Sequence, residues 1–321
     1  MLLKMKMTHK KTNCMRIKPI VPIITILLCW VCLPKAGAQQ IFAISQYMQN
    51  NFIYNPAAAG ANDNPSVGAL YRKMWSGIDG GPQTTILYGD TYFEKKKTGL
   101  AVFVYDDKTG PTSRTGGQVN LSYSINLGND KTKRLMFGLG GSFMQYTIDE
   151  AYLSQYLNNT NEPVLANGSP DSKITGDAAA GIYLKTPTLN IGASVEQIIQ
   201  SKLGFLKSQT NTQGQLYRNY FVMADYNIRT DDEDVLIPNA LLMYVPNTPV
   251  DLQGGAKLMH EDFLWIGLGY HYKQSYTVYA GVKVAHKLEL GYAYDQYQTP
   301  LSAFDNGSAS NEFSIRYYFI K

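Results

Sequence analysis

The chain has 321 residues, of which 45% are hydrophobic and 17% charged, with 24 tyrosines and 28 glycines. The charged fraction is below the roughly 25% of soluble proteins, and the hydrophobic fraction excludes a disordered chain. Few charges and many tyrosines are typical of a membrane β-barrel with aromatic girdles, although a tyrosine-rich soluble β protein has a similar composition.

The N-terminus predicts a secretory signal peptide over residues 1–38. A basic stretch precedes the apolar run 20–33, and the small residues 36–38 then fit a cleavage site that leaves Gln39 first in the mature chain. The apolar run is too short for a membrane-spanning helix. Translation can start at Met1 or at Met15.

The signal peptide changes what the composition means. All three cysteines fall inside it, so the mature chain is expected to have no disulfide and no thiol nucleophile. It also holds seven Lys and Arg residues and no acid, which leaves 22 basic and 25 acidic residues in the mature chain. This balance argues against a nucleic-acid partner.

Residues 39–63 lack a clean strand pattern and are expected to form a periplasmic N-terminal segment. Asn55-Pro56 predicts a turn, because proline lacks a backbone donor and disfavours helix at the preceding residue. Such a segment can dock on a partner or plug a barrel, and it can also simply pack before the first strand.

The stretch 116–128 shows the pattern that most of the remaining chain repeats. Val119 and Leu121 alternate with Asn120 and Ser122, so a strand here has one apolar and one polar face. A half-buried strand of a soluble sheet has the same alternation. Fourteen strands are predicted, at 67–75, 84–92, 98–106, 116–128, 134–148, 176–185, 189–196, 217–229, 235–245, 250–258, 264–271, 275–284, 288–294 and 312–319.

The lengths of the connections separate the two alternatives. Even-numbered connections are short, and every long one is odd-numbered, although two odd ones, 246–249 and 272–274, are also short. Short periplasmic turns that alternate with longer external loops are typical of outer-membrane barrels. The long connections are 76–83, 107–115, 149–175, 197–216 and 295–311.

We therefore predict that residues 64–321 form an all-β fold, an antiparallel transmembrane outer-membrane β-barrel of about 14 strands with both termini periplasmic. The expected location is the outer membrane of a Gram-negative bacterium, with the barrel in contact with its lipid. The sequence alone does not specify whether the lumen is open.

Few residues suggest chemistry. The mature histidines, His260, His271 and His286, lack metal-ligand spacing, and no G-x-S-x-G motif is present. The acidic turn 230–234 lacks the ligand order of a calcium-binding EF-hand loop. We expect no enzyme activity, catalytic residue, metal or cofactor.

Two groups of motifs resemble a known family. The first is Tyr54-Asn-Pro-Ala-Ala-Ala-Gly60, followed by Arg72-Lys-Met-Trp75 and Gly81-Pro-Gln-Thr-Thr85. The second is Gly291-Tyr-Ala-Tyr-Asp295 with Asn311-Glu-Phe-Ser314. Together they resemble the PorP/SprF family, outer-membrane proteins of the type IX secretion system of Bacteroidetes, over nearly the entire mature chain.

The resemblance implies a non-enzymatic role in the export or surface attachment of secreted proteins, including gliding adhesins. The implied partners are other type IX secretion components and secreted cargo. The alternative is an outer-membrane pore or transporter for small solutes, and a barrel enzyme has less support. The candidate partner-binding residues are Tyr54, Asn55, Pro56, Gly60, Arg72, Trp75 and Pro82.

Overall fold

The computed structural model describes residues 43–62, 64–128, 131–149, 171–203, 214–298 and 309–320. The expected signal peptide and its cleavage site lie outside these residues. The helices are η1 (Tyr47–Ile53), η2 (Pro56–Ala58) and η3 (Glu94–Lys96). The strands are β1 (Ser66–Lys73), β2 (Gln83–Phe93), β3 (Thr98–Thr109), β4 (Thr112–Asn126), β5 (Arg134–Ile148), β6 (Asp171–Lys185), β7 (Leu189–Glu196), β8 (Lys202–Leu203), β9 (Gly214–Gln215), β10 (Asn219–Tyr226), β11 (Ile228–Arg229), β12 (Asp234–Tyr244), β13 (Asp251–His260), β14 (Leu264–His271), β15 (Ser275–Val284), β16 (Leu288–Tyr297) and β17 (Ser310–Tyr318).

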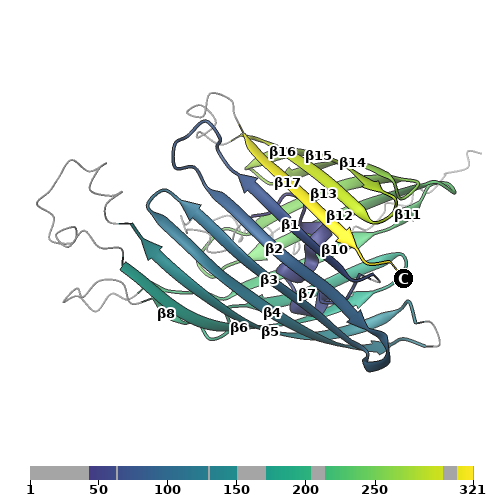
Figure 1. Ribbon diagram of the computed structural model, residues 1–321, viewed down its shortest axis with the longest axis horizontal. Coiled ribbons are helices and arrows are strands. Elements are labelled where there is room, and N and C mark those ends of the chain that lie inside the picture. The colour runs from purple at the N-terminus through teal and green to yellow at the C-terminus, as the bar shows by residue number, and fades with distance from the viewer. Residues whose placement is uncertain are drawn as a thin grey trace, which may run out of the picture.

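The strands close into an antiparallel barrel (Figure 1). Successive strands of the wall pair with one another, with β7 paired to β10, and β1 pairs with β17 to close the ring. Because β10 and β11 both pair with β12 and are separated only at Asn227, they form one interrupted strand of the wall. The described wall therefore has fourteen strands, as predicted, while β8 and β9 form a separate hairpin between β7 and β10.

The predicted separation of faces is confirmed on β4. Leu121 is 54% exposed on the outside, whereas Asn120, its neighbour, is completely buried inside. Exposed apolar side chains continue around the outer surface, which suits lipid, and polar side chains point into the lumen. No helix in the described ranges is long and apolar enough to span a membrane.

The two ends of the barrel differ as expected. The β1–β2 connection and the β3–β4 turn lie at the end from which the longer connections leave the strands, the long-loop end, on the left of Figure 1. Short turns such as that between β2 and β3 lie at the opposite, short-turn end. One prediction was wrong: 107–115 is not a loop, because β3 and β4 extend to a tight turn at Gly110-Pro111. Gly110 has a φ of +53°, which glycine adopts without strain.

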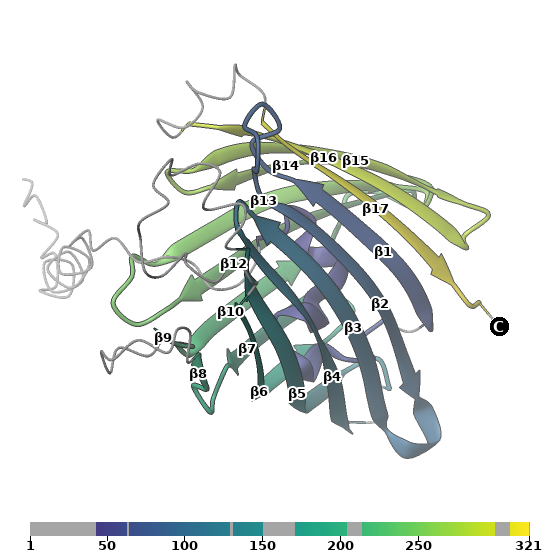
Figure 2. The same cartoon turned by 60° about the vertical axis from the view of Figure 1, so that its left-hand side comes forward.

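The N-terminal segment does not form a separate unit outside the barrel. Its described residues, 43–62, lie inside the lumen, where η1 and η2 are enclosed by the strands (Figure 2). We call residues 43–62 the plug. Apolar plug residues such as Phe52 and Ala57 pack with wall residues such as Met136 and Phe221 into one core cluster. The hydrophobic core is therefore between the plug and the wall.

The two chain ends lie at different depths. Phe319 donates its backbone N–H to Pro65 O at the short-turn end, over 2.8 Å. Ala43, the first described residue, lies inside the barrel and lines a small pocket with Asp251 and Met243 near the long-loop end. The mature N-terminus predicted at Gln39 lies outside the described residues.

Candidate functional site: a plug held in the barrel lumen

The first plug anchor is a buried charge cluster near the long-loop end. Arg72 Nη1 lies 2.8 Å from Asp295 Oδ2 and 3.0 Å from Glu312 Oε2, and all three side chains are at most 4% exposed. Glu312 also accepts the backbone N–H groups of Ser45 at 2.8 Å and Gln46 at 2.9 Å. The cluster joins the plug to β1, β16 and β17, and we call it the Arg72 cluster.

Ser45 completes this cluster. Its hydroxyl donates to Asp295 Oδ2 over 2.7 Å and accepts a hydrogen bond from Arg72. Asp295 accepts a further bond from Thr277. Because one cation faces two carboxylates, these extra donors are needed to balance the buried negative charge. Removing Arg72 would leave two buried carboxylates without their cation.

A second anchor lies deeper, on β17. The Arg316 guanidinium donates to Gln49 O and to Asn50 Oδ1, both on η1. It also donates to Tyr88 OH over 3.3 Å. Arginine suits this position because its five donors lie in a fixed plane and can reach several acceptors at once.

The Asn55-Pro56 turn fits against the barrel wall. Asn55 Oδ1 accepts the N–H of Ala57 at 2.9 Å and so caps η2, while Pro56 occupies the first helical position, which tolerates proline. Asn55 Nδ2 donates to Ile182 O on β6 over 3.0 Å. The predicted turn is thus also a point of attachment to the wall.

Glycine lets the wall approach η2 closely. A Cβ placed on Gly138 of β5 would come nearer than 3.0 Å to Pro56 and Ala57 backbone atoms. A Cβ on Gly181 of β6 would collide with the Asn55 side chain, whose Oδ1 caps η2. These two wall positions require glycine while η2 stays in place.

Polar side chains on the lumen face of the wall donate hydrogen bonds to backbone carbonyl groups of the plug. Asn120 donates to Phe52 O over 2.7 Å, and Ser122 donates to Ala59 O over 2.6 Å, both from β4. From β7, Ser194 donates to Tyr54 O over 2.6 Å. Carbonyl groups buried without partners would cost free energy, so these side chains replace the bonds that a sheet would supply.

The last part of the plug is held at the short-turn end. Asp90 accepts the N–H of Gly60 at 2.6 Å, and Gly60 has a φ of +71°. Lys185 and Arg134 both donate to Ala61 O. The plug is therefore bonded to the wall from near one end of the barrel to the other.

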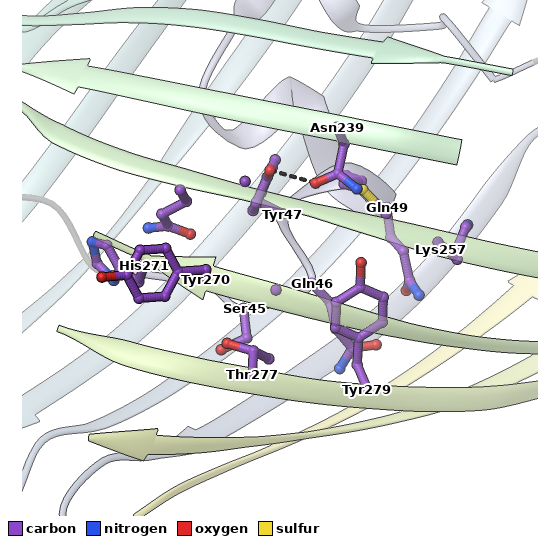
Figure 3. Close-up of a pocket in the computed structure, with 14 residues that line it drawn as sticks. Ser45, Gln46, Tyr47, Gln49, Asn239, Lys257, Tyr270, His271, Thr277 and Tyr279 are labelled. Atoms are coloured by element: carbon purple, nitrogen blue, oxygen red, sulfur yellow. Dashed lines mark hydrogen bonds between the residues drawn. The ribbon is translucent and has the colours of Figure 1, made fainter. Parts of the chain in front are cut away.

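The plug also carries an internal contact. Tyr54 OH accepts the N–H of Ile44 at 3.1 Å, which ties the start of the plug to its middle. Burial raises the pKa of Tyr54 above its usual value, so the phenol stays neutral. Tyr47 OH donates to Asn239 on β12, across a pocket of about 20 Å³ that admits about one water molecule (Figure 3).

The structure divides the seven candidate partner-binding residues into two groups. The first five are buried in the lumen, four in the plug and one in the Arg72 cluster: Tyr54, Asn55, Pro56, Gly60 and Arg72. With the plug in place they hold it to the wall and offer no surface to a partner. The other two, Trp75 and Pro82, lie in the β1–β2 connection at the long-loop end.

The two groups are linked through one tyrosine. Trp75 packs edge-on against Tyr297, with ring centroids 6.4 Å apart, and the Tyr297 hydroxyl accepts from Arg72 Nη2 over 3.3 Å. Met74 N donates to Pro82 O over 2.8 Å and closes the connection. Tyr297 thus connects the β1–β2 connection, which forms the rim at the long-loop end, to the Arg72 cluster.

Sequence reasoning missed several residues that hold the plug. Asp295 and Glu312 lie in the family motifs and Arg316 alternates with apolar residues of the last strand, but no role was predicted for these three or for Gly138. The alternation could have placed all four on the lumen face, since each has the parity of the polar set in its strand. Their plug contacts depend on the tertiary fold.

The histidines pair with acids on the barrel wall. His271 contacts Asp251 next to the long-loop end, and His260 lies 2.8 Å from Asp234 at the short-turn end. In the acidic turn, the Asp231 carboxylate accepts the N–H groups of Glu233 and Asp234. That carboxylate is engaged in shaping its own turn.

Several solved structures are similar to this chain, and one with a TM-score above 0.5 supports the barrel fold. The CymD monoaromatic hydrocarbon channel has a TM-score of 0.51 at 11% identity, over 89% of this chain and 96% of that one. The Acinetobacter baumannii protein Omp33 has a TM-score of 0.46 at 7% identity, over 80% and 98%. A Pseudomonas aeruginosa FadL homologue has a TM-score of 0.46 at 10% identity, over 83% and 93%.

At these identities the likeness concerns the fold, which is that of an outer-membrane barrel. A search of curated proteins finds no match. A family model described as type IX secretion system membrane protein PorP/SprF matches residues 36–317. The chain therefore belongs to the PorP/SprF family and is a secretion-related outer-membrane barrel.

Proposed function

We propose that this protein is a non-enzymatic subunit of type IX secretion that acts by binding partners while its lumen stays closed. The observation that carries the proposal is the plug, which is hydrogen-bonded to the wall from the Arg72 cluster to Ala61. If the lumen stays closed, secretion partners can bind this barrel only at its two ends. The partners are other secretion components and cargo, including gliding adhesins, and the result is export or surface attachment of that cargo.

The second candidate is a channel for small solutes. CymD, which shares the barrel fold, is described as a monoaromatic hydrocarbon channel. For the present chain, conduction requires that the plug leave the lumen or rearrange. Such a change would break the Arg72 cluster and the Arg316 bonds to η1, which are buried and charge-assisted. Binding with the plug in place avoids that cost.

The test combines three measurements: cargo secretion, retained partners and ionic conductance. The gene is deleted and complemented, cargo secretion is measured, and the complex is purified in mild detergent to identify retained partners. The purified barrel is then placed in a planar bilayer. The proposal expects complementation of secretion, retained secretion components and no steady ionic conductance. A wild-type barrel that conducts and retains no partner would favour the channel.

A further inference from the structure

A polar pocket lies under the plug at the short-turn end. Its volume is about 210 Å³, and its floor includes the plug residues Gln49 and Asn51. The wall residues come from five strands and from Asn227 after β10, and they include Lys185, Asn190, Asp225, Asn227 and Lys257. These side chains are half-buried, so the pocket is open to solvent at this mouth.

Most polar groups of the pocket are already engaged. Asn190 Nδ2 donates to Asp225 Oδ2 over 2.6 Å, and Asn227 Nδ2 donates to Pro187 O over 3.0 Å. Lys185 donates to Ala61 O of the plug. These contacts fix the shape of the wall around one remaining cation.

That cation is Lys257. Within the described ranges it makes no hydrogen bond or ion pair, and the carboxylates of Glu289 and Asp225 attract it only from beyond ion-pair distance. Its ammonium lies over the Trp265 ring at 5.6 Å from the centroid. In Figure 3 it lies beside Gln49 at the edge of the adjoining pocket. A half-buried ammonium has lost part of its hydration and gains from an anionic acceptor. Lys257 therefore favours a carboxylate ligand.

The surroundings support the same ligand class. Lys185 and Lys257 outweigh Asp225, so the pocket lining has a net positive charge. The amide nitrogens of Asn51 and Asn62 donate to Tyr183 OH over 3.1 Å and to Asp90 Oδ2 over 3.3 Å, and their carbonyl oxygens can accept from a peptide N–H. The volume accommodates side chains of a short segment and excludes a folded domain.

We propose that this pocket binds an acidic side chain of a polypeptide segment that reaches the barrel from the short-turn end. The inference deepens the proposed function and rests on it, because it places one partner contact at that mouth. The bound segment would lie directly against Gln49 and Asn51. A bound partner would thus be in direct contact with the plug.

The test uses the purified full-length mature barrel and a fluorescent peptide, (Gly-Asp)3 amide, with (Gly-Asn)3 amide as the neutral counterpart. Fluorescence anisotropy at low salt measures binding. We expect Lys257→Gln to weaken binding of the aspartate peptide about tenfold, the effect of losing one charge-assisted bond. Lys257→Arg should retain binding. Lys287→Gln removes the same charge from an exposed turn at the same end, outside the pocket, and should bind like wild type.

Three results would overturn the inference. The first is equal binding of the two peptides, and the second is equal binding by wild type and folded Lys257→Gln. The third is displacement of the peptide by free succinate at the same concentration, which would identify a small-anion site. In cells, Lys257→Gln should reduce cargo secretion. If this variant secretes normally while the gene deletion does not secrete, the pocket does not bind the partner. That result would not affect the proposed function.

Discussion

At the scale of single residues, the plug is held in the lumen by buried charged side chains. Arg72 lies between Asp295 and Glu312, and the Glu312 carboxylate holds two backbone N–H groups of the plug. A buried pair is costly to break because the remaining partner keeps a charge that water no longer solvates. The same residues therefore stabilise the barrel and fix the position of the plug.

The substitution Arg72→Met tests this role. We expect it to lower the free energy of unfolding by about 3–5 kcal/mol, because two carboxylates lose their buried partner. Lys108→Met is the control, since Lys108 pairs with Asp106 at the same end but is 64% exposed, and its loss should cost about 0–1 kcal/mol. Urea unfolding in lipid vesicles measures both. Equal costs would show that the Arg72 cluster is not a buried, coupled unit.

Close approach is a second residue-scale feature. Gly138→Ala should displace η2, because the new Cβ would overlap Ala57 backbone atoms. Gly141→Ala on the same strand should have no effect beyond about 0.5 kcal/mol, because nothing lies within 4 Å of its Cβ position. The readout is thiol labelling of Ala58→Cys, buried in the parent protein. Unchanged labelling in the Gly138 variant would refute the close fit.

At the scale of elements, alternation was enough to predict the strands and their faces. Leu121 outside and Asn120 inside follow directly from the two-residue period of a strand. Alternation alone does not give contacts between distant segments. Arg72 and Glu312 are 240 positions apart in sequence, and nothing local indicates that they meet around Ser45.

The strand ends show another limit of local patterns. Residues 107–115 contain charged and turn-forming residues, and they were therefore predicted as a loop. In the barrel, Asp107 accepts bonds from Thr84 and Arg114 across neighbouring strands, and these polar pairs extend the hairpin. The location of residues 43–62 was open for a similar reason, because the turn at Asn55-Pro56 is compatible with several environments.

Deleting residues 39–60 tests the plug as an element. Closure depends on the β1–β17 and β7–β10 pairs, which do not include the plug, so the barrel should still assemble. Its lumen should then fill with water and conduct ions. Heat-modifiable migration and planar-bilayer conductance check the two expectations. Loss of the folded band would mean that the plug is required for closure, and a folded, silent barrel would mean that the wall collapses inward.

At the scale of the whole molecule, the barrel presents two unlike mouths. The short-turn end holds the polar pocket around Lys257, and the long-loop end holds the rim around Trp75. Each mouth can meet a different set of partners only if the barrel has one fixed orientation. We expect the short turns in the periplasm, as in other outer-membrane barrels.

Single cysteines test that orientation. The expected mature chain has no cysteine, so labelling has no background. With an impermeant thiol reagent on intact cells, Gly110→Cys at the long-loop end should react and Lys96→Cys at the short-turn end should not. After the outer membrane is permeabilised, both should react. Labelling of Lys96→Cys alone on intact cells would show that the short turns face the outside of the cell.

Locking the plug in place shows whether secretion needs the lumen to open. Cysteines replace Ala59 on the plug and Ser122 on β4, which are in contact because the Ser122 hydroxyl lies 2.6 Å from Ala59 O. Cargo secretion is measured in oxidised and reduced cells, with the cross-linked fraction scored in the same samples and single-cysteine variants as controls. While the plug is locked, we expect cargo secretion at the wild-type level. Secretion that stops on oxidation and returns on reduction would contradict it.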